Sequence, residues 1–290
     1  MALKTLYLSD IDGTLARAGY DLREDTAQMM KRITRREIPF AVATGRYVSK
    51  ALPVISQAGI MLPALVLNGA MIFDPVKGEA VKTWPIGWEE AKQLIRRVEA
   101  AGANVRVIHH RPWEQRCVLY TNEVTPHGGS LTLRNHQGLL YDEQFIFPAI
   151  ADMLEAQGQQ GEILYVGTSG PRELVDKATQ ATQPVPRISA FRHQSPHQAE
   201  KWFLDIVAAT SGKGVAALWL KEYLQAQTLV TLGDNENDKP LLQAGDIACT
   251  VPEAPEGVKA LADVVLPGGI NCVPQYVMER EGILATPASE

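Results

Sequence analysis

The sequence predicts an α/β protein with a doubly wound, Rossmann-like parallel sheet as its core and an α+β cap domain inserted between the two halves of that sheet. Short apolar runs that each end in a polar cluster occur near the amino terminus and again near residue 230, as buried parallel strands do. The first two runs flank a segment with apolar residues at helical spacing, which indicates a βαβ unit. The chain of 290 residues is long enough for this core and for a separate inserted domain.

The core elements follow in order along the two halves of the chain. The charged segment 22–37 carries Met29, Met30 and Ile33 at helical spacing and is predicted to be an amphipathic crossover helix. A second amphipathic stretch, 215–224, follows a glycine-rich turn and is predicted to be helical. Buried strands are predicted at 4–9, 39–44, 64–67 and 228–232.

The middle of the chain mixes short strands with helices and is rich in Pro, Gly and Gln, which favours an inserted α+β domain. We therefore assign 1–81 to the first part of the core, 82–208 to the cap and 209–290 to the second part of the core. Helices are predicted at 88–101 and 147–157, and strands at 105–109, 117–121, 162–167, 187–192 and 202–207.

The composition excludes several classes of function. Basic residues number 28 and acidic residues 33, giving a net charge of -5 with no basic run, so we expect no nucleic-acid partner. The three cysteines are scattered without a Cys-x-x-Cys spacing, which suggests neither disulfides nor a structural zinc site. The opening apolar residues meet Ser9 and Asp10 too early for a signal peptide or a membrane span, so we expect a cytoplasmic protein without a membrane partner.

Four polar clusters lie at predicted strand ends or helix starts. The first, Asp10-Ile11-Asp12-Gly13-Thr14, is either a simple strand-ending turn or a chemical site, in which Asp10 is a nucleophile or metal ligand and Asp12 an acid and base. Each of the other clusters also has a structural interpretation, as a turn or a helix start. They are Thr44-Gly45-Arg46, Ser211-Gly212-Lys213-Gly214 and Gly233-Asp234-Asn235-Glu236-Asn237-Asp238.

The joint occurrence of these clusters favours the chemical interpretation. At average residue frequencies the first and last patterns would each arise by chance in such a chain on the order of 1 in 300 to 1 in 500 times. Two carboxylates about 4 Å apart repel by about 4 kcal/mol at an effective dielectric near 20, so a carboxylate cluster needs cations. Oxygen ligands without His or Cys select a hard ion, of which Mg²⁺ is the natural candidate, and Lys213 supplies a further positive charge.

These residues carry a resemblance to a known family. The set Asp10-x-Asp12-Gly13-Thr14, Thr44, Lys213 and Gly233-Asp234-x-x-Asn237-Asp238 resembles the four motifs of the haloacid dehalogenase (HAD) superfamily of phosphohydrolases. The long segment between the second and third motifs, with Thr-Gly-Arg in the second and Asn68-Gly69-Ala70 just before the cap, is similar to the Cof-type, class IIB branch, whose members are mostly sugar-phosphate phosphatases. The resemblance implies a Mg²⁺-dependent phosphohydrolase that acts on a small phosphorylated metabolite such as a sugar phosphate.

The resemblance also implies a role for each site residue. Asp10 would form an aspartyl-phosphate, Asp12 would act as acid and base, and Lys213 would offset negative charge. The substrate would be held by Thr44, Gly45, Arg46 and Asn237. The metal would be bound by Asp10, the Asp12 carbonyl and Asp234, with Asp238 orienting Lys213 or a metal-bound water.

The chain departs from the class IIB pattern after the fourth motif. Where that class has a loop ending Gly-Asn-Ala, this chain has Pro252-Glu253-Ala254, so we give Glu253 no phosphate-binding role. The pair Val251-Pro252 and the later Pro267-Gly268-Gly269 resemble mannosyl-3-phosphoglycerate phosphatases, whereas Thr44-Gly45-Arg46 is unlike the second motif of that group. A phosphatase of the mannosyl-3-phosphoglycerate or sucrose-phosphate type stays an alternative. A sugar phosphomutase is a second alternative, and a non-catalytic protein that binds a phosphate ligand is a third.

Two further patterns have competing interpretations. Gly212-x-Gly214-x-x-Ala217, with Asp234 about 20 residues further on, imitates the dinucleotide-binding fingerprint. In the cap, His109, His110 and Arg111 either contact a sugar phosphate or form a solvated turn, and His127 and His193 have no stronger support.

Overall fold

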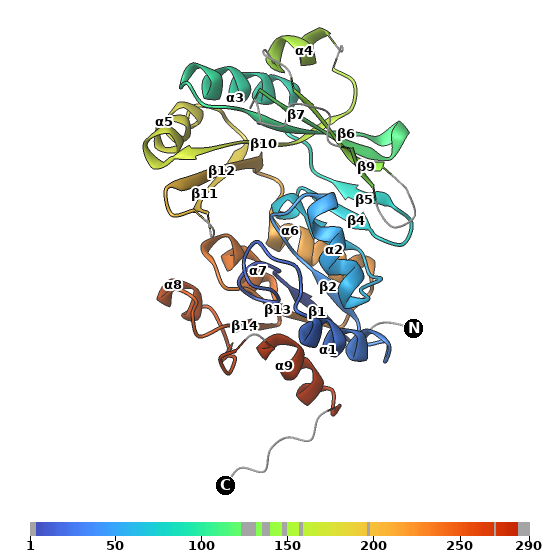
Figure 1. Cartoon of the computed structure of the whole chain (residues 1–290). Helices are drawn as coiled ribbons and strands as arrows, with labels where there is room; N and C mark the ends of the chain where they lie inside the picture. Colours follow the sequence, from blue (N-terminus) through green and yellow to red (C-terminus); the bar gives the residue numbers. More distant parts are fainter. Residues whose placement is uncertain are drawn as a thin grey trace. The chain divides into compact units, whose positions relative to one another are not determined.

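The computed structural model describes residues 4–122, 132–134, 140–146, 150–156, 159–195, 198–269 and 271–283 (Figure 1). The chain divides into two compact units. One unit combines Met1–Val76 with Lys213–Glu290, and the other is the continuous segment Lys77–Gly212. The chain therefore leaves the first unit, builds the second, and returns to the first.

The first unit is centred on a parallel sheet in the order β15-β14-β13-β1-β2. This order places β1 beside both β2 and β13, so the two parts of the chain extend the sheet in opposite directions from β1. The predicted doubly wound α/β fold is thereby confirmed. The strands are β1 (Thr5–Ser9), β2 (Phe40–Val42), β13 (Thr228–Leu232), β14 (Ile247–Thr250) and β15 (Val264–Val265).

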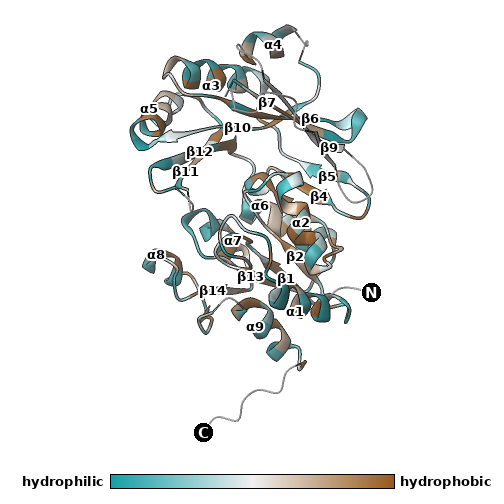
Figure 2. Ribbon diagram, in the orientation of Figure 1, coloured by the Kyte–Doolittle hydropathy of each residue, from teal (hydrophilic) through white to brown (hydrophobic). Residues whose placement is uncertain are grey.

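Helices cover both faces of this sheet, because right-handed crossovers toward opposite edges of a sheet place their helices on opposite faces. The longer helices are α1 (Glu24–Thr34), α2 (Val48–Ala58), α6 (Lys213–Tyr223) and α9 (Cys272–Arg280). Shorter ones are η1 (Leu67–Gly69), η3 (Glu236–Asp238), α7 (Lys239–Ala244) and α8 (Glu256–Lys259). In α1, Met30 and Ile33 are buried while the charged residues form the hydrophilic outer side that Figure 2 shows, which is the predicted amphipathic pattern.

The run predicted as a strand at 64–67 differs from its prediction. It forms β3 (Ala64–Val66), which pairs antiparallel with β4 (Met71–Asp74) and meets the end of β2 in one isolated parallel bridge. The chain reverses between β3 and β4 because Leu67 and Asn68 both adopt left-handed backbone, with φ of 54° and 53°. The run is therefore the first strand of a hairpin beside the sheet and not a further full strand of it.

The second unit is the inserted α+β cap. Its sheet has the order β11-β12-β10-β6-β7-β9-β8 and is antiparallel except between β7 and β9. The strands of the unit are β5 (Glu79–Thr83), β6 (Arg106–Arg111), β7 (Arg116–Thr121), β8 (Thr132–Arg134), β9 (Leu140–Ile146), β10 (Glu162–Pro171), β11 (Ile188–Gln194) and β12 (Lys201–Ala208), and η2 (Pro112–Glu114) joins β6 to β7.

The cap helices are α3 (Trp88–Ala100), α4 (Ile150–Ala156) and α5 (Arg172–Thr182). α3 and α5 pack on β10, and α5 also packs on β12, so these helices lie against one face of the cap sheet. The helix predicted at 147–157 corresponds to α4, and both predicted ends lie outside the described residues. Among the described residues of the whole chain, every helix is too short or too polar to run across a lipid bilayer.

Candidate active site

The clusters predicted at strand ends meet at one edge of the parallel sheet. Ser9 at the end of β1 pairs with Leu232 at the end of β13, so Asp10 and Asp234 follow neighbouring strands. The backbone N–H of Asp10 donates to the Leu232 carbonyl at 2.8 Å, which continues the ladder into the loop. This carboxyl edge is where open α/β sheets bind their ligands.

A buried lysine joins two of the predicted carboxylates. Nζ of Lys213, the first residue of α6, donates at 2.5 Å to Oδ1 of Asp10 and at 2.5 Å to Oδ1 of Asp238. The side chains of Lys213, Asp10 and Asp238 are only 1%, 6% and 1% exposed. Burial acts to lower the pKa of Lys213, but the two carboxylates outweigh it and hold the pKa above its ordinary value. The lysine therefore stays charged.

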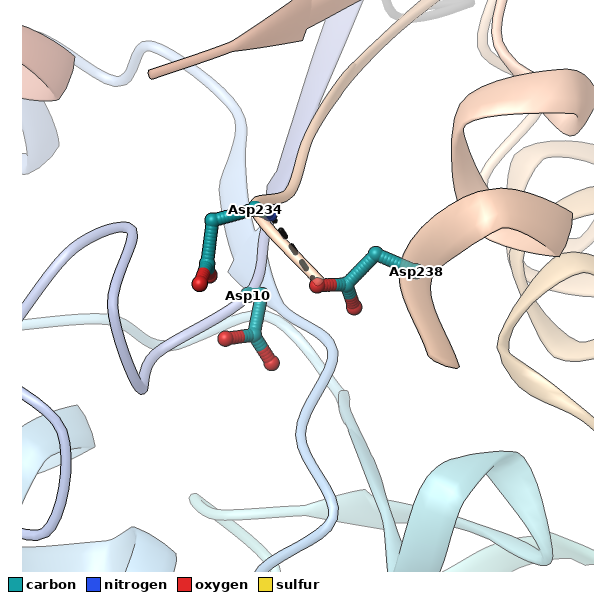
Figure 3. Close-up of side chains that lie close together, drawn as sticks. All are labelled: Asp10, Asp234 and Asp238. Carbon is teal, nitrogen blue, oxygen red and sulfur yellow. Dashed lines mark hydrogen bonds between the residues drawn. The ribbon is translucent and has the colours of Figure 1, made fainter. Parts of the chain in front are cut away.

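Asp238 and Asp234 complete the carboxylate group shown in Figure 3. Oδ2 of Asp238 accepts the backbone N–H groups of Asp234 and of the next residue, at 3.1 and 3.0 Å, so both oxygens of Asp238 are engaged. Oδ1 of Asp234 accepts the Thr14 hydroxyl at 2.6 Å. Gly13 (φ 97°) lies so close that a Cβ there would be 2.3 Å from Oδ2 of Asp234, which explains a glycine at this position.

The three carboxylates fit a hard divalent cation. Asp10, Asp234 and Asp238 each place one oxygen within 4.8 Å of the others, and one lysine faces three acids. Burial raises the pKa of Asp10, although Lys213 opposes it, and burial raises the pKa of Asp234 to about 6. Mg²⁺ and similar hard ions prefer oxygen ligands, and carboxylates with too few neighbouring cations attract them.

Asp12 lies outside this carboxylate group and pairs with Arg46. Nε of Arg46 donates to Oδ2 of Asp12 at 2.8 Å, and Nη2 donates to Oδ1 at 2.7 Å, which is the bidentate arrangement. Burial acts to raise the pKa of Asp12, but Arg46 and the N–H of Gly19 outweigh it and hold the pKa below its ordinary value. The side chain of Asp12 is thus turned to Arg46, which leaves only its backbone carbonyl for the predicted metal role.

The second cluster lies beside the first, after β2. Thr44 is fully buried, and its hydroxyl oxygen accepts the backbone N–H of Arg46 at 3.1 Å. A Cβ at Gly45 would lie 3.0 Å from Oδ1 of Asn68, and Nδ2 of Asn237 donates to that oxygen at 3.2 Å. Asn68, to which the sequence analysis gave no role, therefore ties the second cluster to the fourth. The sequence feature that could have identified Asn68 is its position directly after a predicted strand.

We predict that Lys213→Met lowers the free energy of unfolding by about 3–5 kcal/mol in EDTA, because it leaves two buried carboxylates without their cation. Urea unfolding followed by circular dichroism measures the change. Lys221→Met is the matched control, since Lys221 lies on the same helix and pairs at 2.7 Å with the more exposed Asp246. An exposed pair contributes about 0–1 kcal/mol, and equal losses in the two variants would contradict the structural role of Lys213.

His109 and His110 lie in β6 and are buried, so the interpretation of 109–111 as a solvated turn is wrong. His109 and His110 are 1% and 4% exposed. Nε2 of His109 donates to the Gln160 carbonyl at 2.6 Å, and Nδ1 of His110 lies 2.9 Å from the Glu162 carboxylate. His127 lies outside the described residues.

The glycine pattern at 212–217 does not have the context that a dinucleotide fingerprint needs, and that interpretation is wrong. The strand before it, β12, is antiparallel to β10 and β11, whereas the fingerprint follows a strand of a parallel βαβ unit. A Cβ at Gly214 would collide with the Pro240 carbonyl, so this glycine lets α6 pack on α7. Asp234, the ribose partner in that interpretation, accepts the Thr14 hydroxyl instead.

Fold and site together define an α/β protein with a carboxylate and lysine site at the edge of its parallel sheet, and comparisons with known proteins identify its class. A family model described as haloacid dehalogenase-like hydrolase matches residues 7–268. A phosphoglycolate phosphatase of Methanopyrus kandleri is 24% identical over 264 residues, covering 91% of this chain and 91% of the relative. A pyridoxal phosphate phosphatase of Escherichia coli is 22% identical over 267 residues, covering 89% of this chain and 91% of the relative.

A solved structure of a sugar phosphatase of HAD subclass IIB has the same fold, with a TM-score of 0.66 at 18% identity over 97% of this chain and 100% of that chain. The chain belongs to the haloacid dehalogenase-like hydrolase family. It is a phosphatase of the Cof type, as the resemblance of its motifs indicates.

Proposed function

We propose that the protein is a Mg²⁺-dependent phosphatase that removes phosphate from a small phosphorylated metabolite, such as a sugar phosphate, through an aspartyl-phosphate on Asp10. The observation that carries the proposal is the buried Lys213 held between Asp10 and Asp238, with Asp234 beside them at the carboxyl edge of the sheet. In this proposal 1–81 and 209–290 carry the chemistry and 82–208 selects the substrate. We also place the protein in the cytoplasm, since its three cysteines are buried and form no disulfide.

Asp10 is the proposed nucleophile. Lys213 holds its Oδ1, so Oδ2 is the oxygen that attacks phosphorus, forming the Oδ2–P bond as the P–O bond to the leaving group breaks. Lys213 offsets the negative charge between the carboxylate and the incoming phosphoryl group. The Thr44 hydroxyl, the N–H of Gly45 and the guanidinium of Arg46 are the proposed donors to the phosphoryl oxygens.

Asp12 is the proposed acid and base. It protonates the leaving oxygen in the first step and takes a proton from the hydrolytic water in the second. The pairing with Arg46 keeps Asp12 ionised, which suits the second step. A phosphoryl group bound near Arg46 competes with Asp12 for the guanidinium, so substrate binding weakens the pair and lets Asp12 carry its proton for the first step. Nδ2 of Asn237 donates to Oδ1 of Asn68, which lies beside Gly45, so Asn237 supports the loop after β2 that carries Arg46.

The proposed Mg²⁺ would be held by one carboxylate oxygen each of Asp10 and Asp234 and by the backbone carbonyl of Asp12, while Asp238 positions Lys213. When bound, the ion would neutralise charge on the transferring phosphoryl group. Thr14 and Gly13 act on Asp234, the first by fixing Oδ1 and the second by leaving room for Oδ2.

The relatives named as phosphatases favour water over a second sugar hydroxyl as the phosphoryl acceptor, so hydrolysis is proposed ahead of a phosphomutase. Their printed substrates, phosphoglycolate and pyridoxal phosphate, differ from the sugar phosphate of the structural neighbour. All are small phosphomonoesters, and that is the substrate class proposed here. The test is release of inorganic phosphate from a panel of such esters with Mg²⁺ and after exhaustive EDTA treatment. Activity that survives EDTA would refute the metal requirement.

We predict that Mg²⁺ stabilises the chain more at pH 7 than at pH 5. The pKa of Asp234 is raised to about 6 in the metal-free fold, above about 3.9 in the unfolded chain, so the folded state binds more protons between these values. The free energy of unfolding contributed by this group is therefore fully present below about pH 4 and is lost as the pH rises through about 6. Mg²⁺ offsets that loss where Asp234 is ionised, and competes with its proton below pH 6.

The measurement is the melting temperature with and without Mg²⁺ across this pH range. Asp234→Asn is the matched variant, because it removes both the titration and the ligand charge. A Mg²⁺-induced shift that is the same at pH 5 and pH 7, or that persists in Asp234→Asn, would contradict the assignment.

A further inference from the structure

Among the described residues of the cap, one face of the sheet carries no helix and gathers charged side chains. Along β12, Leu204 and Ile206 belong to the apolar core under α3 and α5, so alternation puts Phe203 and Asp205 on the opposite face. The strand register continues this face across the sheet. It aligns Asp205 with Gly167 of β10, and Gly167 with Arg106 of β6.

The carboxylate of Asp205 is already satisfied on this face. The Tyr165 hydroxyl donates to its Oδ1 at 2.6 Å, and Nε2 of His193 lies 3.1 Å from its Oδ2. A Cβ at Gly167 would collide with the Tyr165 hydroxyl, so the glycine is what allows the tyrosine to reach Asp205. Asp205 therefore serves to hold Tyr165 and His193 in place, and it does not hydrogen-bond Arg106.

Arg106 has donors without partners. Its guanidinium lies 5.4 Å from the centroid of the Phe203 ring, and its Nε and Nη2 atoms are buried and make no hydrogen bond within the described structure. Buried donors of a charged group are nearly always paired in proteins. Nε and Nη2 form the edge of a guanidinium that binds two oxygens of one carboxylate or phosphate side by side.

Other cations surround the same ring. Nζ of Lys201 lies 5.5 Å from the centroid of Phe203, and the ring of His193 stacks on it at 5.1 Å. Burial acts to lower the pKa of His193, but Asp205 outweighs it and raises the pKa. Around Phe203, Arg106 and Lys201 together with a readily protonated histidine face the carboxylate of Asp205, so among the described residues this cluster carries an excess of positive charge.

We propose that Arg106, Lys201 and His193 form an oxyanion site of the cap, in which the Nε and Nη2 edge of Arg106 receives a carboxylate or a phosphate group of a small metabolite. The site shares no residue with the Asp10 centre, and where its ligand is the substrate the inference rests on the proposed function. The half-buried side chain of Arg106 reaches the ligand by turning about its terminal torsions, and in doing so it exchanges two unpaired donors for two charge-assisted hydrogen bonds. The oxyanion belongs either to the substrate itself, as a second acidic group, or to a separate metabolite.

The first arm of the test uses the whole chain with Mg²⁺ and a matched pair of esters, 3-phosphoglycerate and glycerol 3-phosphate, which differ by a carboxylate. Arg106→Gln is expected to raise KM for 3-phosphoglycerate about tenfold or more, while KM for glycerol 3-phosphate changes less than about twofold. Arg106→Lys recovers part of the loss. Arg192→Gln is the control, because Arg192 lies 5.4 Å from the Trp202 ring but pairs with Asp176.

The second arm needs no turnover and so remains informative if the proposed phosphatase reaction fails. Malonate is titrated into the chain in EDTA, and the melting temperature is followed. The site is supported if malonate raises the melting temperature of the wild type and of Arg192→Gln but not that of Arg106→Gln. If the KM values are unaffected at the same time, the ligand is a separate metabolite. A KM effect limited to 3-phosphoglycerate assigns the site to the substrate. Arg106→Gln behaving as the wild type in both arms would overturn the proposal.

Discussion

Asp10→Asn is expected to lower kcat by roughly 10⁴-fold or more on every phosphomonoester, because an amide cannot form the aspartyl-phosphate. The fold is expected to survive. The amide keeps the shape of the side chain and its oxygen can still accept from Lys213, which reaches Oδ1 at 2.5 Å. Since burial raises the pKa of Asp10, the uncharged amide also suits this position in the absence of metal. Steady-state phosphate release measures the loss.

The control for Asp10→Asn is Asp25→Asn, which neutralises a partly exposed carboxylate on α1 that pairs with Arg23. It is expected to leave kcat unchanged. The melting temperature of Asp10→Asn in EDTA at pH 7 is expected to equal or exceed that of the wild type. A loss of only a few-fold in kcat with an intact fold would exclude Asp10 as the nucleophile.

Asp12→Asn is expected to lower the rate of the first step, phosphoryl transfer to Asp10, by roughly 10²–10⁴-fold with a sugar phosphate. With an activated aryl phosphate the rate of this step is expected to fall far less. A sugar alkoxide must be protonated as it leaves, whereas an aryl oxide leaves without help. With the aryl substrate the variant still forms the aspartyl-phosphate but hydrolyses it slowly, because no base takes the proton of the water. A burst followed by a slow steady state is the expected trace.

Asp21→Asn is the matched control for Asp12→Asn, because Asp21 also lies near Arg46, at 4.0 Å from Nη1, and is more exposed. It is expected to leave the ratio of the two substrate rates unchanged. Intact-protein mass spectrometry detects the phosphoenzyme in Asp12→Asn. Equal slowing of both substrates without a covalent intermediate would show that Asp12 is not the acid and base.

Much of the fold and of the site could be predicted from local patterns. The strand at 228–232 has its predicted bounds, and the runs at 4–9 and 39–44 form β1 and β2 with ends trimmed by one to two residues. The doubly wound sheet and membership of the haloacid dehalogenase-like family are confirmed. Local patterns suffice here because a buried strand needs a continuous apolar run and because ligand groups gather where such strands end.

The sequence by itself determined the residue types of the site and the strand ends that carry them, but not which side chains pair. Lys213 meets Asp10 across 203 positions, and Arg46 meets Asp12 across 34. Asn68 became part of the site only through the left-handed turn after β3. In the cap, the partner of His193 and the unpaired edge of Arg106 follow from the register of four strands. A shift of one residue would send each side chain to the other face of the sheet, and this register is set by the packing of the whole sheet and not by any one strand. Tertiary structure therefore decided the pairing of charges, because a hydrogen bond needs its two groups within about 3 Å and only the folded chain brings distant positions that close.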